Sequence, residues 1–326
     1  MKFHFIVSAC VSLLFCYTPI NAQFAPPVGH EGNTAMYKDS SAFVAWANKC
    51  HVTRGFQDIS NQSLGYTNVG DSSLAIGQAG TNGVVSLGDG GVAILEFSSP
   101  ILDGNGPDFA VFENGFDDLF LELAFVEVSS DGIHFFRFPA ISNTDTTTQT
   151  DGFGLTDASK LHNLAGKYRA EYGTPFDLAD IANDALLNKQ SITHVKVIDV
   201  VGSIQNQYCS RDANNHKIND PWPTGWGNGG FDLDAVGVIH QQAVGINELE
   251  LRNISIYPNP ATDMLYVNLP STNYSVEVIN LMGEVVLKSE NKSNTTFIEI
   301  NNLKSGVYFL TISSEGQQKQ MKFVKL

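Results

Sequence analysis

Short apolar runs with a side-chain period of two, separated by turns of glycine and aspartate, recur along most of this chain. In "GVVSLGDGGVAILEF", residues 83–97, such runs flank a Gly-Asp-Gly-Gly turn, which predicts a hairpin. Further runs with strand character lie at 108–116, 121–139, 192–202 and 229–239. The pattern, in a chain with 29 glycines among 326 residues, predicts an all-β fold with a jelly-roll-like β-sandwich as its main domain.

Two segments between these runs have helical features instead. Ser40 or Ser41 can cap "AFVAWANKC", residues 42–50, and Asp177 can cap "LADIANDALLNK", residues 178–189. We therefore expect two short helices in the main domain.

The N-terminus has the pattern of a secretory signal peptide. Lys2 precedes an apolar run that ends at Cys16, and Ala22 supplies a small residue before the expected cleavage site at Gln23. The run is shorter than the roughly 20 apolar residues that cross a bilayer. We expect removal of residues 1–22 and a mature chain without a transmembrane anchor.

The last quarter of the chain, from residue 251, predicts several short strands and a small Ig-like β-sandwich. Its motifs "YPNP" (257–260), "LKSGVY" (303–308) and "KFVKL" (322–326) resemble the C-terminal sorting domain (type A) of the type IX secretion system of Bacteroidetes. The resemblance implies that residues 253–326 engage the type IX secretion machinery and that the tail is then removed. It also implies that the protein is released or attached at the cell surface, outside the outer membrane.

The acidic charge belongs to the region before this tail. Residues 23–250 hold 11 lysines and arginines against 28 acidic residues, a net charge near −17, whereas residues 251–326 hold 7 against 6. Such a field repels nucleic acid and attracts cations, so we expect no nucleic-acid partner. We take 23–240 as the main domain and 241–252 as the linker.

The main domain itself resembles an uncharacterised family of secreted or cell-surface bacterial proteins, many with sorting tails. The shared stretches are "VSLGDGG" (85–91), "DFAVFENGF" (108–116), "ELAFVEVSSDG" (122–132), "NLAGKY" (163–168), "GTPFDLAD" (173–180), "NDPWPT" (219–224) and "GGFDLDAVGVI" (229–239). The resemblance implies a location and no particular reaction.

Two cysteines, Cys50 and Cys209, follow the signal peptide. An oxidising periplasm permits a disulfide between them, which would constrain the unfolded chain by about 4 to 5 kcal/mol in the chain-entropy picture. The sequence leaves open whether they pair or remain two small core residues.

The segment "DGNGPDFAVFENGFDD", residues 103–118, contains several acidic residues on both sides of a short apolar run. Oxygen-bearing side chains alternate with glycines at its start, which suits Ca²⁺. An EF-hand would need an acid at the twelfth position, which is Asn114, so that motif is excluded. We predict instead a Ca²⁺ site shared between this loop and a distant strand, with Glu122 as a further candidate. Its ligands would be Asp103, Asp108, Glu113, Asp232 and Asp234. The alternative is a solvated acidic rim with turn-forming residues.

A second candidate site is "NDPWPTGWGNGG", residues 219–230, where Trp222 and Trp226 stand outside any periodic pattern. Exposed tryptophans can form platforms for sugars, and Asp220 and Asn228 would bind hydroxyl groups. The alternative is that both rings cover an edge of the sandwich.

The sequence contains no Gly-x-Ser-x-Gly elbow and no His-Glu-x-x-His motif. We therefore assign no catalytic residues and predict a secreted or cell-surface binding or adhesion module, stabilised by Ca²⁺ and binding glycan. One alternative is an extracellular polysaccharide hydrolase, for which Glu113 and Asp232 would be the paired carboxylates. Another is a structural surface-layer component.

Overall fold

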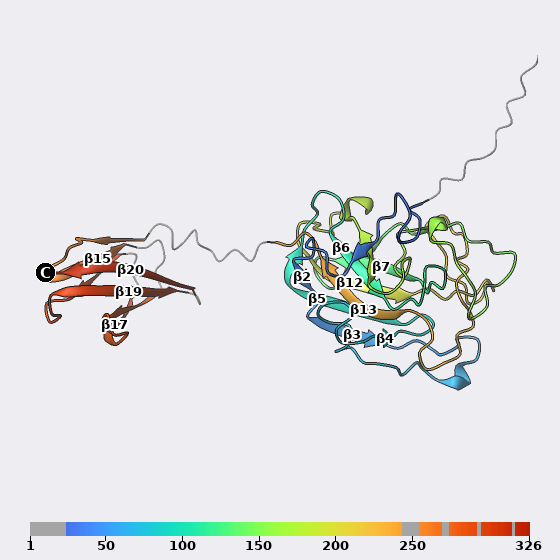
Figure 1. Ribbon diagram of the computed structural model, residues 1–326, viewed down its shortest axis with the longest axis horizontal. Coiled ribbons are helices and arrows are strands. Elements are labelled where there is room, and N and C mark those ends of the chain that lie inside the picture. Colours follow the sequence, from blue (N-terminus) through green and yellow to red (C-terminus); the bar gives the residue numbers. More distant parts are fainter. Residues whose placement is uncertain (1–23, 243–253, 269–273, 292–294, 315–316) are drawn as a thin grey trace, which may run out of the picture. The chain divides into compact units, whose positions relative to one another are not determined.

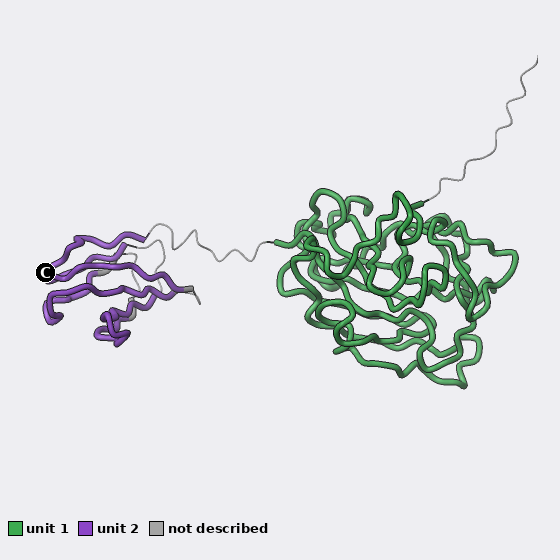
Figure 2. Tube along the Cα trace, viewed as in Figure 1, with its two compact units in different colours: residues 1–242 green, residues 243–326 purple. Residues whose placement is uncertain are grey.

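The computed structural model describes residues 24–242, 254–268, 274–291, 295–314 and 317–326 (Figure 1). The chain divides into two compact units, Met1–Gln242 and Ala243–Leu326 (Figure 2). The expected signal peptide at 1–22 and the expected linker from residue 243 to 252 lie outside the described residues. None of the helices in the described ranges is long and apolar enough to cross a membrane.

The main unit is built on two antiparallel sheets that share one apolar core. The first has the order β1-β11-β6-β13-β2, with β4 also paired to β13, and the second has the order β3-β5-β12-β7-β8. The first sheet comprises β1 (Met36–Tyr37), β11 (Tyr172–Phe176), β6 (Phe109–Glu113), β13 (Asp232–Val238), β2 (Ala45–Trp46) and β4 (Val85–Ser86). The second comprises β3 (Lys49–Thr53), β5 (Val92–Ile101), β12 (Ile192–Asp199), β7 (Ala124–Ser129) and β8 (Phe136–Arg137). The predicted all-β sandwich is confirmed.

The two central strands of the first sheet, β6 and β13, are buried at every residue. Alternate side chains such as Val111 and Val236 enter the shared core, because successive residues of a strand point to opposite faces. On the other face, Phe112 is covered by Phe43 and Trp46, with ring centroids 5.6 and 5.4 Å away. This double burial explains the apolar run Phe109–Phe112 in β6 and the apolar second half of β13 from Ala235.

The expectation of two short helices is corrected. Residues 42–50 supply β2 and the start of β3, because their apolar side chains pack on the sheets as strands do. Asp177 does act as a cap, accepting a hydrogen bond from the backbone N–H of Ala179 at 2.9 Å, but the helix that follows is only the 3₁₀ turn η3 (Leu178–Asp180). The remaining short elements are η1 (Gln62–Leu64), η2 (Ala158–Lys160), β9 (Ile141–Ser142) and β10 (Leu161–His162).

The second unit is a small sandwich with its own core. One sheet has the order β14-β15-β18 and the other β17-β16-β19-β20. These strands are β14 (Ser255–Tyr257), β15 (Met264–Asn268), β16 (Tyr274–Ile279), β17 (Val285–Asn291), β18 (Thr295–Glu299), β19 (Gly306–Ser314) and β20 (Gln317–Lys325). Asn259 of the "YPNP" motif binds the last strand, donating to the carbonyl of Lys322 and accepting from the N–H of Val324 at 3.1 and 3.0 Å. The motif therefore anchors the C-terminal strand.

Candidate functional site

Three long loops of the main unit are joined by hydrogen bonds into one surface. They are residues 114–123 between β6 and β7, residues 143–157 after β9, and residues 200–231 between β12 and β13. The N–H of Thr156 donates to the carbonyl of Leu119 at 2.7 Å, and that of Trp222 to the carbonyl of Thr150 at 3.1 Å. These loops carry the exposed aromatic residues of the candidate site, and its acidic residues lie in them, at the ends of the neighbouring strands or in the turn between β4 and β5.

The most exposed feature is a row of four aromatic rings, here called the aromatic strip: Phe116, Phe120, Phe153 and Trp226. Successive ring centroids are 5.6, 6.3 and 4.9 Å apart. Phe116 is 77% exposed, Phe153 70% and Trp226 44%. Contiguous exposed apolar surface is a feature that interaction sites share.

Tight turns hold these rings at the surface. The carboxylate of Asp117 accepts the N–H groups of Leu119 and Phe120 at 2.8 and 2.7 Å, which keeps the pKa of Asp117 below its usual value. In the neighbouring loop, Asp151 accepts the N–H of Phe153 at 3.1 Å. A Cβ on Gly152 would lie 2.4 Å from the carbonyl oxygen of Pro223, so the approach of these two loops requires glycine there.

The two tryptophans predicted to bind ligand differ in exposure. Trp226 belongs to the aromatic strip, but Trp222 is only 5% exposed and donates its indole N–H to Asp89 at 3.0 Å. The expectation that both are exposed is therefore corrected, because Trp222 satisfies its polar atom inside the protein. Asn228 is exposed and Asp220 is buried. A role of these residues in binding stays a prediction.

Beneath the loops lies a group of acidic side chains, here called the carboxyl chamber: Asp89, Glu113, Glu122, Asp199, Asp220 and Asp232. Contacts between distant segments bring them together. Asp220 accepts the N–H of Leu123, next to Glu122, at 2.9 Å, and Asp199 accepts the N–H of Phe231, next to Asp232, at 2.8 Å. Strand pairing places Glu113 opposite Leu233.

Burial dominates the electrostatics of the chamber. It raises the pKa of Asp89 and of Asp232 to about 6, and it raises the pKa of Glu113, Asp199 and Asp220 well above the usual range. Repulsion between the acids adds to this. For the partly buried Glu122, desolvation is the largest cause of a strongly raised pKa, followed by the charge of Glu113.

Two buried oxygens of the chamber have no hydrogen-bond partner, Oε2 of Glu113 and Oδ1 of Asp220. These side chains are 2% and 3% exposed. The carboxylates of two other chamber acids do accept hydrogen bonds. Asp199 accepts two backbone N–H groups and Asp232 accepts the hydroxyl of Ser86.

The five predicted Ca²⁺ ligands occupy three separate places. Asp108 and Glu113 bracket β6, and five residue steps of about 3.3 Å separate them by about 16 Å. Glu113 and Asp232 belong to the carboxyl chamber. Asp234 lies where the register between β13 and β6 shifts, and both its oxygens accept the N–H of Gly80 at 3.1 and 2.9 Å. The five residues therefore cannot share one ion, and metal binding by any of them stays a prediction.

Asp103 and Asp108 form a second acidic group together with Asp177. Each offers an oxygen within 4.8 Å of the others. The buried Asp108 accepts the N–H groups of Gly104 and Leu178 at 2.7 Å each and faces Nδ1 of His240 at 2.8 Å. Both oxygens of Asp108 are thus occupied, and this side chain joins three chain segments.

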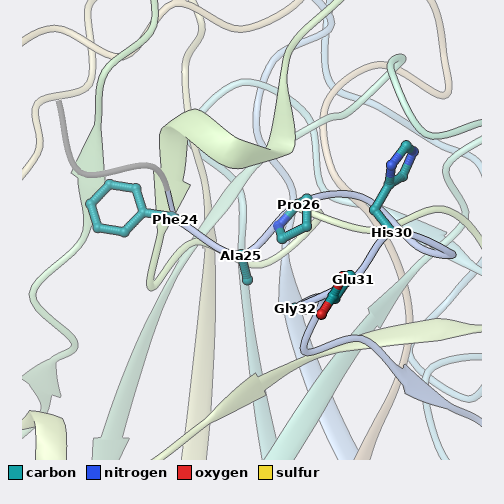
Figure 3. A pocket seen from close by; sticks show the side chains of 6 residues that line it. All are labelled: Phe24, Ala25, Pro26, His30, Glu31 and Gly32. Carbon is teal, nitrogen blue, oxygen red and sulfur yellow. The ribbon is translucent and has the colours of Figure 1, made fainter. Parts of the chain in front are cut away.

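Two cavities in the described part of the main unit have linings that can be compared with the aromatic strip and the carboxyl chamber. An open pocket of about 550 Å³ is lined only by the segment from Phe24 to Gly32 and involves none of the three loops (Figure 3). A smaller cavity of about 140 Å³ is lined mainly by the segment that also carries Phe153, and its lining is largely polar. Its residues are Thr144, Asp145, Thr148, Thr150, Leu155, Thr156, Asp157, Lys160 and Asn219.

The two remaining cysteines are free thiols in the structure. Burial raises the pKa of Cys50 to about 12, and the thiol of Cys209 faces the carbonyl of Asn206 at 3.7 Å. Of the two readings left open by the sequence, the structure shows the unpaired one.

Three rings of the aromatic strip and two acids of the carboxyl chamber were not among the site residues predicted from the sequence. Phe116, Phe120 and Phe153 stand in loops rich in glycine and aspartate, "ENGFDDLF" and "DGFGL", where a large aromatic residue is an available signal. Asp89 and Asp199 gave no comparable signal, because only the tertiary contacts bring them beside Glu113.

Comparison with known proteins identifies the second unit. Residues 255–326 match the family described as "Secretion system C-terminal sorting domain", which confirms the resemblance of the tail. An endo-acting ulvan lyase of Formosa agariphila is 27% identical over 88 residues, or 26% of this chain and 17% of that protein.

Two solved structures give weaker likenesses. PorZ, a surface component of the type IX secretion system of Porphyromonas gingivalis, is 18% identical with a TM-score of 0.23, over 28% of this chain and 14% of PorZ. A β-glucuronidase from Ruminococcus gnavus is 12% identical with a TM-score of 0.23, over 93% of this chain and 47% of the enzyme. This chain thus spans less than half the length of each.

Proposed function

We propose that this protein, a secreted or cell-surface protein exported by the type IX secretion system through its sorting domain at residues 255–326, binds glycan chains on the aromatic strip of its main unit. The observation that carries the proposal is the row of four neighbouring rings, three of them with large exposed surfaces. The apolar faces of sugar rings pack on such aromatic surfaces, and aromatic anchors dominate binding energy.

The surroundings of the strip suit a hydroxylated ligand. The 140 Å³ cavity in the segment that carries Phe153 is lined by four threonines, two aspartates, Lys160, Asn219 and Leu155. Thr156 contributes a buried hydroxyl that has no hydrogen-bond partner. Carboxylates such as Asp117 and Asp151 flank the rings, and Arg169 forms an ion pair with Asp118, which lies in the same loop as Asp117. These groups can pair with sugar hydroxyls at the rim of an apolar contact.

Alanine in place of Trp226 or Phe153 is expected to weaken glycan binding at least about tenfold, because each removes one exposed stacking surface from the strip. Affinity electrophoresis of residues 23–326 in gels containing neutral and acidic polysaccharides measures the effect. Tyr66→Ala is the matched control, since Tyr66 is 58% exposed and stacks on Phe56 outside the strip. Equal retention of all three variants contradicts the proposal.

A hydrolase is the second candidate function, favoured by one observation. Glu113 is buried, has a raised pKa and keeps one oxygen free, as a general acid in a polysaccharide hydrolase does. If the protein cleaves its ligand, Glu113→Gln should abolish the release of reducing ends while retention in the polysaccharide gel persists. If the unmodified chain binds polysaccharide but releases no reducing ends, the hydrolase is excluded and the protein is a binding module.

A further inference from the structure

We propose that the carboxyl chamber binds one Ca²⁺ ion, held by the unpaired oxygens of Glu113 and Asp220 with Glu122 beside them. This site differs from the ligand set predicted from the sequence. It also goes beyond glycan binding, because it does not depend on the identity of any ligand on the aromatic strip.

The geometry assigns the ion to one end of the chamber. A Cβ on Gly115 would lie 2.8 Å from Oε2 of Glu113 and 3.5 Å from the carbonyl oxygen of Phe120. The absence of a side chain at Gly115 thus lets the unpaired oxygen of Glu113 lie against the backbone of this loop, next to the carbonyl of Phe120 and the Cα of Arg169. Asp220 reaches the same loop, since its other oxygen binds the N–H of Leu123.

The buried carboxylates of the chamber have no positively charged partner in the ranges that the structure describes, which favours binding of a cation. Among the described residues, none of the six carboxyls has a lysine, arginine or histidine within ion-pair distance; the nearby Arg54 donates to backbone carbonyls instead. Buried carboxylates without a partner either take up protons or coordinate a metal ion. Two buried oxygens without any hydrogen bond mark where the ion would lie.

Ca²⁺ fits these donors better than other common metals. The available ligands are all oxygens, and Ca²⁺ takes six to eight of them from carboxylates, carbonyls and water in flexible geometry. Within the described part of the chain, no three chamber acids bring oxygens within 4.8 Å of one another. Carbonyls and water would therefore complete the shell. Ca²⁺ accepts such a mixed shell in irregular geometry, whereas Mg²⁺ requires near-ideal octahedral geometry with shorter metal–oxygen distances.

The group of Asp103, Asp108 and Asp177 is the obvious competitor. Its acids do converge, but the oxygens of Asp108 are already filled by two N–H groups and His240. A cation there would have to displace hydrogen bonds that join three segments of the main unit. Asp103→Asn is therefore a matched control in the same unit.

The test uses residues 23–326 freed of metal by a chelator and then dialysed. All three tryptophans lie in the main unit, so their fluorescence during heating reports the unfolding of that unit alone. Calcium at 100 times its dissociation constant is expected to raise Tm by roughly 5 to 10 °C, with one ion bound by calorimetry and a much smaller effect of Mg²⁺.

Glu113→Gln and Asp220→Asn should each abolish the Ca²⁺-dependent rise, and Gly115→Ala should weaken Ca²⁺ binding at least tenfold. In chelator, the two amide variants should melt no lower than the unmodified protein, because each replaces an acid that is unfavourable to bury without a cation by a neutral amide of the same shape. A Tm in this range shows that the variants fold. Absence of Ca²⁺ binding overturns the proposal. So does a rise that persists in these variants or disappears in Asp103→Asn.

Discussion

Replacing Trp222 with alanine is expected to lower the Tm of the main unit by about 10 °C, whereas Trp226→Ala should change it by no more than about 2 °C. Truncating a buried aromatic side chain costs about 3 to 5 kcal/mol, and each kcal/mol corresponds to about 2 to 4 °C in a domain of this size. Trp222 is 5% exposed and Trp226 is 44% exposed. Asp89 would in addition lose the indole N–H that it accepts.

Thermal unfolding of both variants, followed by circular dichroism, measures the difference. Trp222→Phe separates packing from hydrogen bonding, since it keeps an aromatic ring but removes the donor to Asp89, and its Tm should fall between the two. A Trp222→Ala protein that melts normally and fails to bind glycan would instead show that Trp222 is part of the binding platform, as the sequence suggested.

Lowering the pH from 8 to 5 in the presence of a chelator is expected to raise the free energy of unfolding of the main unit. Burial raises the pKa of Asp89, Asp232 and Asp234 from 3.8 to about 6. The folded state therefore binds these protons more tightly than the unfolded state, so protonation near pH 6 favours folding. The gain is complete near pH 3.8, and for one fully buried acid it amounts to about 3 kcal/mol at most.

At lower pH, a second group of acids has the opposite effect on the free energy of unfolding, and it limits the pH range in which acidification stabilises the main unit. Exposed acids such as Asp71, Asp117 and Asp145 have pKa values lowered by hydrogen bonds from Ser73, Phe120 and Thr147 respectively. Their stabilising contribution is present above the unfolded pKa and is lost as the pH falls below about 4. Maximum stability is therefore expected near pH 5.

Urea unfolding at pH 8, 6.5 and 5, followed by tryptophan fluorescence, measures this dependence. Asp232→Asn should flatten the rise, because it removes one titrating group, while Asp117→Asn should leave the slope between pH 8 and 5 unchanged. A free energy of unfolding that decreases from pH 8 to 5 would mean that the chamber acids are ionised and neutralised within the folded protein.

The strands were largely predictable, because a strand's period of two and its glycine turns are local properties of the sequence. The buried runs of β6 and β13 are examples. The turn around Gly88 is present, but the hairpin predicted there is wrong, because β4 pairs with β13 in the first sheet and β5 pairs with β3 and β12 in the second. The helix expected at residues 42–50 failed for a tertiary reason. Phe43 and Trp46 have contacts with Phe112 across the sheet, and this packing outweighs a capping signal.

The sequence by itself determined the sorting tail, the uneven charge and the strand content, since motif, composition and alternation depend only on neighbouring residues. The candidate site was decided by the tertiary structure. Glu113 and Asp220 are distant in sequence and become neighbours only through the loops that Leu123 joins. Likewise, Trp222 and Trp226 look equivalent in sequence, yet packing buries one and exposes the other. Burial and convergence are properties of the folded chain, and they decide which carboxyls lack partners and which rings can bind a ligand.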